Sequence, residues 1–190
     1  MNLDFSDIRV LLIGDFMIDH YIMGKSNRIS PEASVPVVIP EEEYSIPGGA
    51  GNVAMNLSSM GANVTCLGVV GDDIWGKKLL SILEKEGIDT NGIKTIQNHP
   101  TTLKKRIYSN GKQVARLDRE RTIDFKSDFL SKNINNYDVC IFSDYNKGVI
   151  KDIKINTDMV IVDPKKDNFS LYKNAHIITP NLNELQRATG

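Results

Sequence analysis

The chain contains little cysteine and little histidine, with two cysteines and three histidines among 190 residues. Cys66 and Cys140 both lie inside apolar, strand-like runs, so we expect buried free thiols in a reducing compartment rather than a disulfide or a metal site. The histidines do not have the spacing of metal ligands. No Ser-His-Asp or Cys-His arrangement is supported, which disfavours the enzyme classes that depend on one.

An excess of charge is also missing. Lys and Arg number 23 and Asp and Glu number 24, so the formal net charge is −1. A balance this close to neutral disfavours electrostatic binding to nucleic acid or to an anionic membrane. No apolar run reaches the roughly 18–20 residues that cross a bilayer, and the N-terminus lacks the pattern of a signal peptide. We therefore expect a cytoplasmic globular protein that binds neither nucleic acid nor membrane.

Short apolar runs alternate with helical patterns along the chain, which predicts βαβ units and a mostly parallel sheet flanked by helices. The predicted strands are Arg9–Ile13, Val64–Val70, Val139–Phe142, Met159–Val162 and, more weakly, Ala175–Thr179. The predicted helices are Ala50–Met60, Ile74–Glu86 and Phe125–Ile134.

Two stretches interrupt this alternation and predict a small antiparallel β lid that projects from the α/β core. Residues 17–43 are strand-like and partly polar, with Val35–Ile39 at their centre. Residues 101–119 read as a β-hairpin, because Asn110-Gly111 is a strong turn signal between two strand-like runs.

A glycine-rich turn, Pro47–Ala54, opens the first predicted helix. Glycines allow close approach of a ligand, and free N–H groups at a helix start favour oxygen-rich or anionic ligands. Asn52 adds a side chain that both donates and accepts hydrogen bonds, as sugar hydroxyls require. Asp19 follows the end of the first strand, where open α/β sheets bind ligands, and it suits a polyol. A tight helix entry and an ordinary turn are the alternative interpretations of these residues.

The hairpin carries a group of basic residues. Lys104 and Arg106 share one face of their strand by two-residue alternation, and a paired cationic face suits a phosphate monoester. A strict two-residue turn places Arg116 on the opposite face from Arg106, whereas a one-residue bulge places them together. The sequence leaves this register open, and a solvated strand face is the alternative.

Three later strand ends each present an acid or an amide. Asp144 follows the strand that ends at Phe142 and is a candidate for substrate binding. Lys165 follows the next strand, and Asn181 and Glu184 follow the one after it. Asn181 and Glu184 suit a hydrated Mg²⁺, which prefers oxygen ligands. They equally suit a helix N-cap with its N3 partner, and both roles are compatible.

These motifs, in this order, resemble the ribokinase-like (PfkB) sugar kinases, and the resemblance covers nearly the whole chain. It is carried by Ile13–Tyr21, Ser26–Val38, Pro47–Asn56, Leu67–Asp72, Lys104–Arg106, Arg116–Asp118, Ser143–Gly148, Asp163–Lys165 and Thr179–Glu184. The Arg28–Ala33 stretch is specific to the branch that acts on D-glycero-β-D-manno-heptose 7-phosphate, whereas the di-glycine motif is shared more widely.

The resemblance implies ATP-dependent phosphorylation of this heptose 7-phosphate at its anomeric hydroxyl, in the synthesis of ADP-heptose for lipopolysaccharide. It implies a sugar site made by Asp19, Gly48, Gly49 and Asn52, with the sugar phosphate near Lys104, Arg106 and Arg116. Asn181 and Glu184 would organise Mg²⁺ around ATP, Glu184 through water, and Lys165 would lie toward the phosphates. The lid is the family's usual dimer contact, so the resemblance implies a homodimer.

One family motif is absent. The Gly-Ala-Gly-Asp sequence, which in the family forms an anion hole and supplies the catalytic base, does not occur in this chain. We therefore expect the base beyond Gly190 and interpret residues 1–190 as the N-terminal two-thirds of a ribokinase-like kinase domain, inactive by itself. The alternative is a non-catalytic module that binds a sugar phosphate or oligomerises. A dinucleotide-binding oxidoreductase is disfavoured, because the first βα turn lacks the glycine fingerprint.

Overall fold

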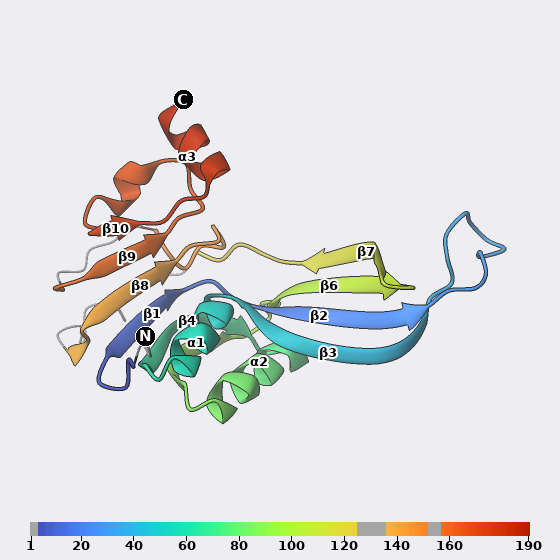
Figure 1. Cartoon of the computed structure of the whole chain (residues 1–190), viewed down its shortest axis with the longest axis horizontal. Coiled ribbons are helices and arrows are strands. Elements are labelled where there is room, and N and C mark those ends of the chain that lie inside the picture. The colour runs from blue at the N-terminus through green and yellow to red at the C-terminus, as the bar shows by residue number, and fades with distance from the viewer. Residues whose placement is uncertain (1–3, 125–135, 152–156) are drawn as a thin grey trace.

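The computed structural model describes residues 4–124, 136–151 and 157–190 (Figure 1). Its centre is a six-stranded sheet in the order β10-β9-β8-β1-β4-β5. The strands are β1 (Arg9–Gly14), β4 (Asn63–Gly71), β5 (Asp89–Ile96), β8 (Val139–Ser143), β9 (Val160–Asp163) and β10 (Ile177–Ile178). Every neighbouring pair is parallel, which confirms the predicted α/β class.

Both faces of this sheet are covered by other elements. Successive residues of β1 point to opposite faces, so neighbouring residues of β1 belong to two different buried clusters. Leu12 packs in one buried cluster with Ala54 of α1 (Ala50–Ser59) and Leu79 of α2 (Ile74–Lys85). Ile13 packs in a second cluster that includes Tyr172 of the 3-10 helix η3 (Phe169–Tyr172). The last helix is α3 (Leu182–Thr189). The continuous apolar runs of the sequence therefore mark strands buried on two sides.

Several sequence predictions can be compared directly with this fold. Both cysteines are buried free thiols, as expected.

The edge strand β5 was not predicted, because five of its eight residues are exposed or polar and it has no apolar run. The predicted helix Phe125–Ile134 lies outside the described residues. Within the part of the chain that the structure describes, no helix is long and apolar enough to cross a membrane.

The lid is a second, four-stranded sheet in the order β3-β2-β6-β7, and it extends away from the core (Figure 1). Its strands are β2 (Phe16–Lys25), β3 (Ile39–Gly49), β6 (Thr102–Ser109) and β7 (Lys112–Arg119). The prediction of an antiparallel lid is wrong in one respect, because β2 and β6 pair in parallel. Both lid strands continue from the carboxyl ends of parallel core strands, β2 from β1 and β6 from β5. They therefore enter the lid in the same direction. Only the outer pairs, β2–β3 and β6–β7, are antiparallel.

The first lid segment also differs in its boundaries. Residues 26–38, including most of the expected Val35–Ile39 strand, form the loop at the far end of the lid, with one bridge between Ile29 and Pro36. The return strand β3 runs instead from Ile39 to Gly49 and leads directly into α1. This delivers the di-glycine turn to the junction between lid and core.

A β-bulge in the hairpin decides the register that the sequence left open. Ser109 pairs with Lys112 and Tyr108 with Gln113, but Ile107 pairs with Ala115, so Val114 is the extra residue. Arg116 therefore lies directly opposite Arg106. The two guanidinium-bearing residues share one face of the lid.

Candidate active site

The site begins where Asp19 of β2 meets the di-glycine turn. A Cβ atom added at Gly48 would lie 2.4 Å from the Asp19 Oδ2 atom, so only glycine leaves room for this carboxylate. Gly49 has a φ of 56° and lies against the backbone of Asp15, a conformation that favours glycine. Gly49 is also the N-cap of α1, and no side chain caps that helix start. The N–H group of Ala50 donates to the Asp15 backbone oxygen, and the other first-turn N–H groups are available to ligand oxygens.

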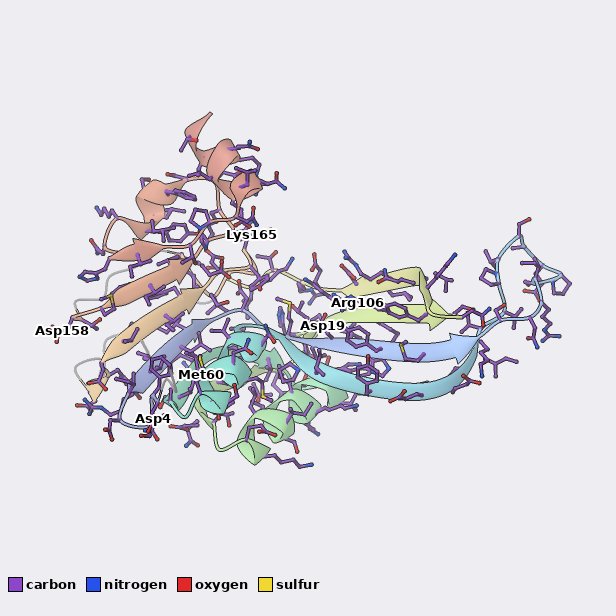
Figure 2. The ribbon with its side chains drawn as sticks, in the orientation of Figure 1. Asp4, Asp19, Met60, Arg106, Asp158 and Lys165 are labelled. Atoms are coloured by element: carbon purple, nitrogen blue, oxygen red, sulfur yellow. The ribbon has the colours of Figure 1, made fainter. Side chains whose placement is uncertain are left out.

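Arg106 donates a hydrogen bond to Asp19 at 2.5 Å, across the β2–β6 pair. The side chains of Arg106 and Asp19 are only 20% and 17% exposed, so the pair is protected from solvent. The guanidinium lies 5.3 Å from the ring centre of Tyr21, in a cation–π contact. The hydrogen bond to Asp19 raises the pKa of Arg106. Figure 2 shows the two residues next to each other on the lid, with Asp19 nearer the core.

The other two predicted phosphate-binding residues lie on the same face. Lys104 is the direct neighbour of Asp19 on one side and of Asp118 on the other. Arg116 is more exposed and donates two hydrogen bonds to Asp118, at 3.0 and 2.9 Å. The face therefore carries three cations, Lys104, Arg106 and Arg116, and two carboxylates, Asp19 and Asp118.

Asn52 lies in the first turn of α1 and is exposed. Among the described residues it makes no interaction with Asp19. The structure therefore brings Gly48 and Gly49 against the Asp19 region and leaves Asn52 beside it on the helix.

Asp15 holds two parts of the site together. Its buried carboxylate accepts hydrogen bonds from the backbone N–H groups of Tyr145, Lys147 and Val149, and its backbone oxygen accepts one from Ala50 at 3.1 Å. Burial raises the pKa of Asp15, against the opposing effect of these hydrogen bonds. In the structure Asp15 orders the loop after β8 and the start of α1.

Asp144, predicted to bind substrate, points into the protein. Its side chain is 0% exposed and pairs with Lys166 at 2.8 Å. It also accepts a hydrogen bond from the Tyr172 hydroxyl at 2.7 Å, which together with burial raises the pKa of that phenol. Two buried carboxylates therefore hold the loop after β8 in place: Asp144 through Lys166 and Tyr172, and Asp15 through backbone N–H groups of the loop.

Lys165, Asn181 and Glu184 form a second cluster on the core side of the site, where Figure 2 marks Lys165. Asn181 and Glu184 make a capping box at the start of α3, with side chain and backbone bonded in both directions. Lys165 pairs with Glu184 at 3.2 Å. The hydrogen bonds from Asn181 and Lys165 lower the pKa of Glu184, although its burial opposes them.

This cluster fits a hydrated divalent cation better than a directly bound one. Both carboxylate oxygens of Glu184 already accept hydrogen bonds, one from Lys165 and one from the Asn181 backbone. The described residues contain no group of three or more His, Cys, Asp or Glu side chains arranged around one point. Asp163 lies nearby, half-buried, and burial together with Glu184 raises its pKa. Such oxygens suit the water shell that Mg²⁺ keeps.

Tyr145 is the residue that sequence reasoning missed. Burial, and then the charges of Asp163, Asp19 and Glu184, raise the pKa of Tyr145. The ammonium of Lys104 lies 5.7 Å from its ring centre. Its hydroxyl has no hydrogen-bond partner among the described residues. The signal available in the sequence was an aromatic residue directly after Asp144 at a predicted strand end.

Comparison with known proteins decides the family. The profile of the pfkB family of carbohydrate kinases matches residues 7–190. This chain belongs to the pfkB family of carbohydrate kinases. It is 41% identical over 201 aligned positions to bifunctional protein HldE of Haemophilus influenzae strain PittEE, covering 98% of this chain and 42% of that protein. The HldE of Helicobacter pylori strain G27 is 42% identical and is also covered to 42%.

The pfkB assignment agrees with the fold of solved structures. The chain superimposes on Arabidopsis thaliana ribokinase, solved with ribose and ATP, with a TM-score of 0.74 at 18% identity. That superposition covers 96% of this chain and 63% of the ribokinase. A carbohydrate kinase from Agrobacterium tumefaciens gives a TM-score of 0.71. The ribokinase-like fold predicted from the motifs is therefore confirmed, and the chain spans about two-fifths of the length of its HldE relatives.

Proposed function

We propose that this chain is the acceptor-binding part of an ATP-dependent kinase for D-glycero-β-D-manno-heptose 7-phosphate, which phosphorylates the anomeric hydroxyl on the way to ADP-heptose. One observation carries the proposal: Asp19, suited to sugar hydroxyls, is surrounded on one lid face by Lys104, Arg106 and Arg116, suited to a phosphate. The likeness to the HldE proteins supports the same substrate class.

In this proposal each group has a separate task. Asp19 accepts sugar hydroxyls, while Gly48 and the uncapped start of α1 let the sugar lie close to the backbone. The lid cations hold the 7-phosphate. Bound ATP with Mg²⁺ supplies the phosphoryl group and spreads its charge. Lys165 would hold the ATP phosphates, and Glu184 would hold the water shell of the metal.

The first test replaces Asp19 by Ala. Loss of its hydroxyl contacts is expected to weaken binding of heptose 7-phosphate by about 1–3 kcal/mol for each buried partner left unsatisfied. Calorimetric titration of the purified chain measures this. The matched control is Asp138→Ala, which breaks an ion pair with Arg9 on the remote side of the core and is expected to leave binding unchanged. Equal affinities of Asp19→Ala and the parent chain for heptose 7-phosphate, with an equal affinity for inorganic phosphate, would remove Asp19 from the sugar site.

The second candidate is a non-catalytic module that binds a sugar phosphate on the same lid face, through Lys104, Arg106 and Arg116. The two candidates separate in a chain extended at its C-terminus by the sequence that follows it in its gene. If that sequence contains Gly-Ala-Gly-Asp and the extended protein consumes ATP with heptose 7-phosphate, the kinase is supported. Binding without turnover supports the module.

A further inference from the structure

The ion pair between Asp19 and Arg106 occupies both groups that the proposed function needs for the substrate. Asp19 is the hydroxyl acceptor and Arg106 is a phosphate ligand, yet in this structure they bind each other at 2.5 Å. A ligand must therefore compete with an internal bond before either group contacts it. This inference rests on the proposed function and concerns how that site selects its substrate.

The pair is held from several sides. The Asp19 carboxylate lies against Gly48, where an added Cβ atom would clash with it. The ring of Tyr21 lies under the Arg106 guanidinium. Both side chains are about four-fifths buried, where salt and water weaken an ion pair less than at the surface. A neutral sugar hydroxyl offers Asp19 an uncharged donor in place of a charged one, and charge-assisted hydrogen bonds are the stronger kind. An unphosphorylated sugar therefore competes poorly.

A phosphate changes this balance because its target is already prepared. Arg116 lies directly opposite Arg106, and Lys104 lies beside Asp19 on the same face. Asp118 pairs with Arg116 on this face, but the three cations outnumber the two carboxylates Asp19 and Asp118, so the face as a whole attracts an anion. A phosphate between the cations engages Arg106 in place of the Asp19 carboxylate.

We propose that the phosphate group of the substrate opens the sugar subsite by drawing Arg106 away from Asp19. The carboxylate is then free to accept the sugar hydroxyls. Recognition of the phosphate and of the hydroxyls is thereby coupled, and the coupling is reciprocal, so each raises the affinity for the other. The ion pair acts as a specificity device against unphosphorylated sugars.

The decisive experiment measures binding of unphosphorylated heptose to the purified chain, with and without inorganic phosphate. Phosphate is expected to tighten heptose binding about 10-fold, within the range typical of coupled sites. Arg106→Ala is expected to bind unphosphorylated heptose more tightly than the parent chain, to lose the phosphate effect, and to bind heptose 7-phosphate more weakly. Heptose affinity that does not respond to phosphate would overturn the proposal.

A second arm needs no sugar and separates this inference from the proposed function. Asp19→Asn removes the competing carboxylate charge, so it is expected to bind inorganic phosphate several-fold more tightly than the parent chain. Asp138→Asn, which breaks the remote pair with Arg9, is the control with the same charge change and is expected to leave phosphate affinity unchanged. Equal phosphate affinities of Asp19→Asn and the parent overturn the ion-pair exchange.

The combined outcomes are distinguishable. If the chain binds neither form of heptose while Asp19→Asn gains phosphate affinity, the proposed function fails and the exchange is supported. If heptose 7-phosphate binds but no coupling is seen, the function stands and the exchange fails. Should Asp19→Asn not fold, as judged by circular dichroism, the phosphate dependence of the unaltered chain decides.

Discussion

At the scale of single residues, the aspartates near the strand ends have different roles, although each follows an apolar strand in the sequence. Asp15 and Asp144 are buried and hold the loop after β8 through backbone and side-chain bonds. Asp19 lies on the lid and pairs with Arg106. The difference follows from the partners of each carboxylate. Asp15 accepts from N–H groups of one loop, Asp144 contacts the side chains of Lys166 and Tyr172, and Asp19 lies on the lid face with the cations.

Tyr145 and Tyr172 allow a matched test of this division. Tyr145→Phe removes a hydroxyl that has no partner among the described residues, so we expect an unchanged unfolding temperature and sugar-phosphate binding weakened by about 0.5–1.5 kcal/mol. Tyr172→Phe removes the bond to the buried Asp144 carboxylate, so we expect lower stability and little change in binding. Thermal unfolding and calorimetry measure both. The opposite pattern would make Tyr145 a structural residue.

At the scale of elements, the lid is joined to the core through α2 by His20 of β2. The ring is 4% exposed and lies 4.9 Å from the Trp75 ring of α2. Its Nδ1 is 2.9 Å from the Ser45 hydroxyl of β3. Charged groups face it from three elements: Glu43 of β3, Lys105 of β6 and Lys78 of α2.

This histidine predicts an acid-sensitive lid. Burial, and then Lys105, lower the pKa of His20 below its ordinary value of 6.5, against the effect of Glu43. The unfolded chain therefore binds the proton more readily, and His20 contributes stability that is present above pH 6.5 and is lost as the pH falls below it. We expect the unfolding temperature to drop less between pH 7 and 5 in His20→Gln than in the parent.

The control for this prediction is Ser45→Ala, which removes the hydroxyl beside His20 Nδ1 and leaves the buried imidazole in place. It is expected to keep the pH dependence of the parent, because burial is the first cause of the lowered pKa of His20. Comparing each variant with the parent cancels other titrating groups, including Asp15, whose raised pKa acts in the opposite direction. An unaltered pH dependence in His20→Gln would show that His20 does not link the lid to α2.

At the scale of the whole molecule, the first prediction is that the 190-residue chain does not transfer phosphoryl groups. Phosphoryl transfer depends on positioning and charge stabilisation. Loss of general base catalysis costs ~10²–10⁴ in rate, and each missing oxyanion donor costs ~10²–10³. A coupled assay for ADP, run on a preparation that binds heptose 7-phosphate, measures this. Turnover at the ordinary enzyme rate of ~1–10³ s⁻¹ would place the base among the residues assigned here to structure.

The second prediction at this scale is a homodimer through the lid. The lid exposes large apolar side chains on its edge strand β7, Leu117 at 54% and Val114 at 43%, and exposed apolar groups gathered on one edge strand favour association. We expect sedimentation at the mass of a dimer and dissociation by Leu117→Lys on β7. Leu185→Lys on α3, equally apolar and 43% exposed, is the control that should remain dimeric. Dimers that survive Leu117→Lys would exclude this part of the lid.

Much of the architecture is determined by the sequence alone. Strands buried on two faces require continuous apolar runs, and the helices between them require apolar residues at helical spacing. The sequence alone therefore predicts six elements: β1, β4, β8, β9, α1 and α2. The Asn110-Gly111 turn and the di-glycine helix entry are equally local, because they depend on the backbone freedom of adjacent residues.

Only the tertiary structure decided how these pieces meet. The parallel pairing of β2 with β6, the bulge at Val114 and the contact of Arg106 with Asp19, 87 residues away in sequence, depend on where both strands leave the core. The inward direction of Asp144 depends on Lys166 and Tyr172, which come later in the chain. Local patterns act between neighbours in sequence, whereas the partner of a charge or of an edge strand is chosen by packing among segments far apart.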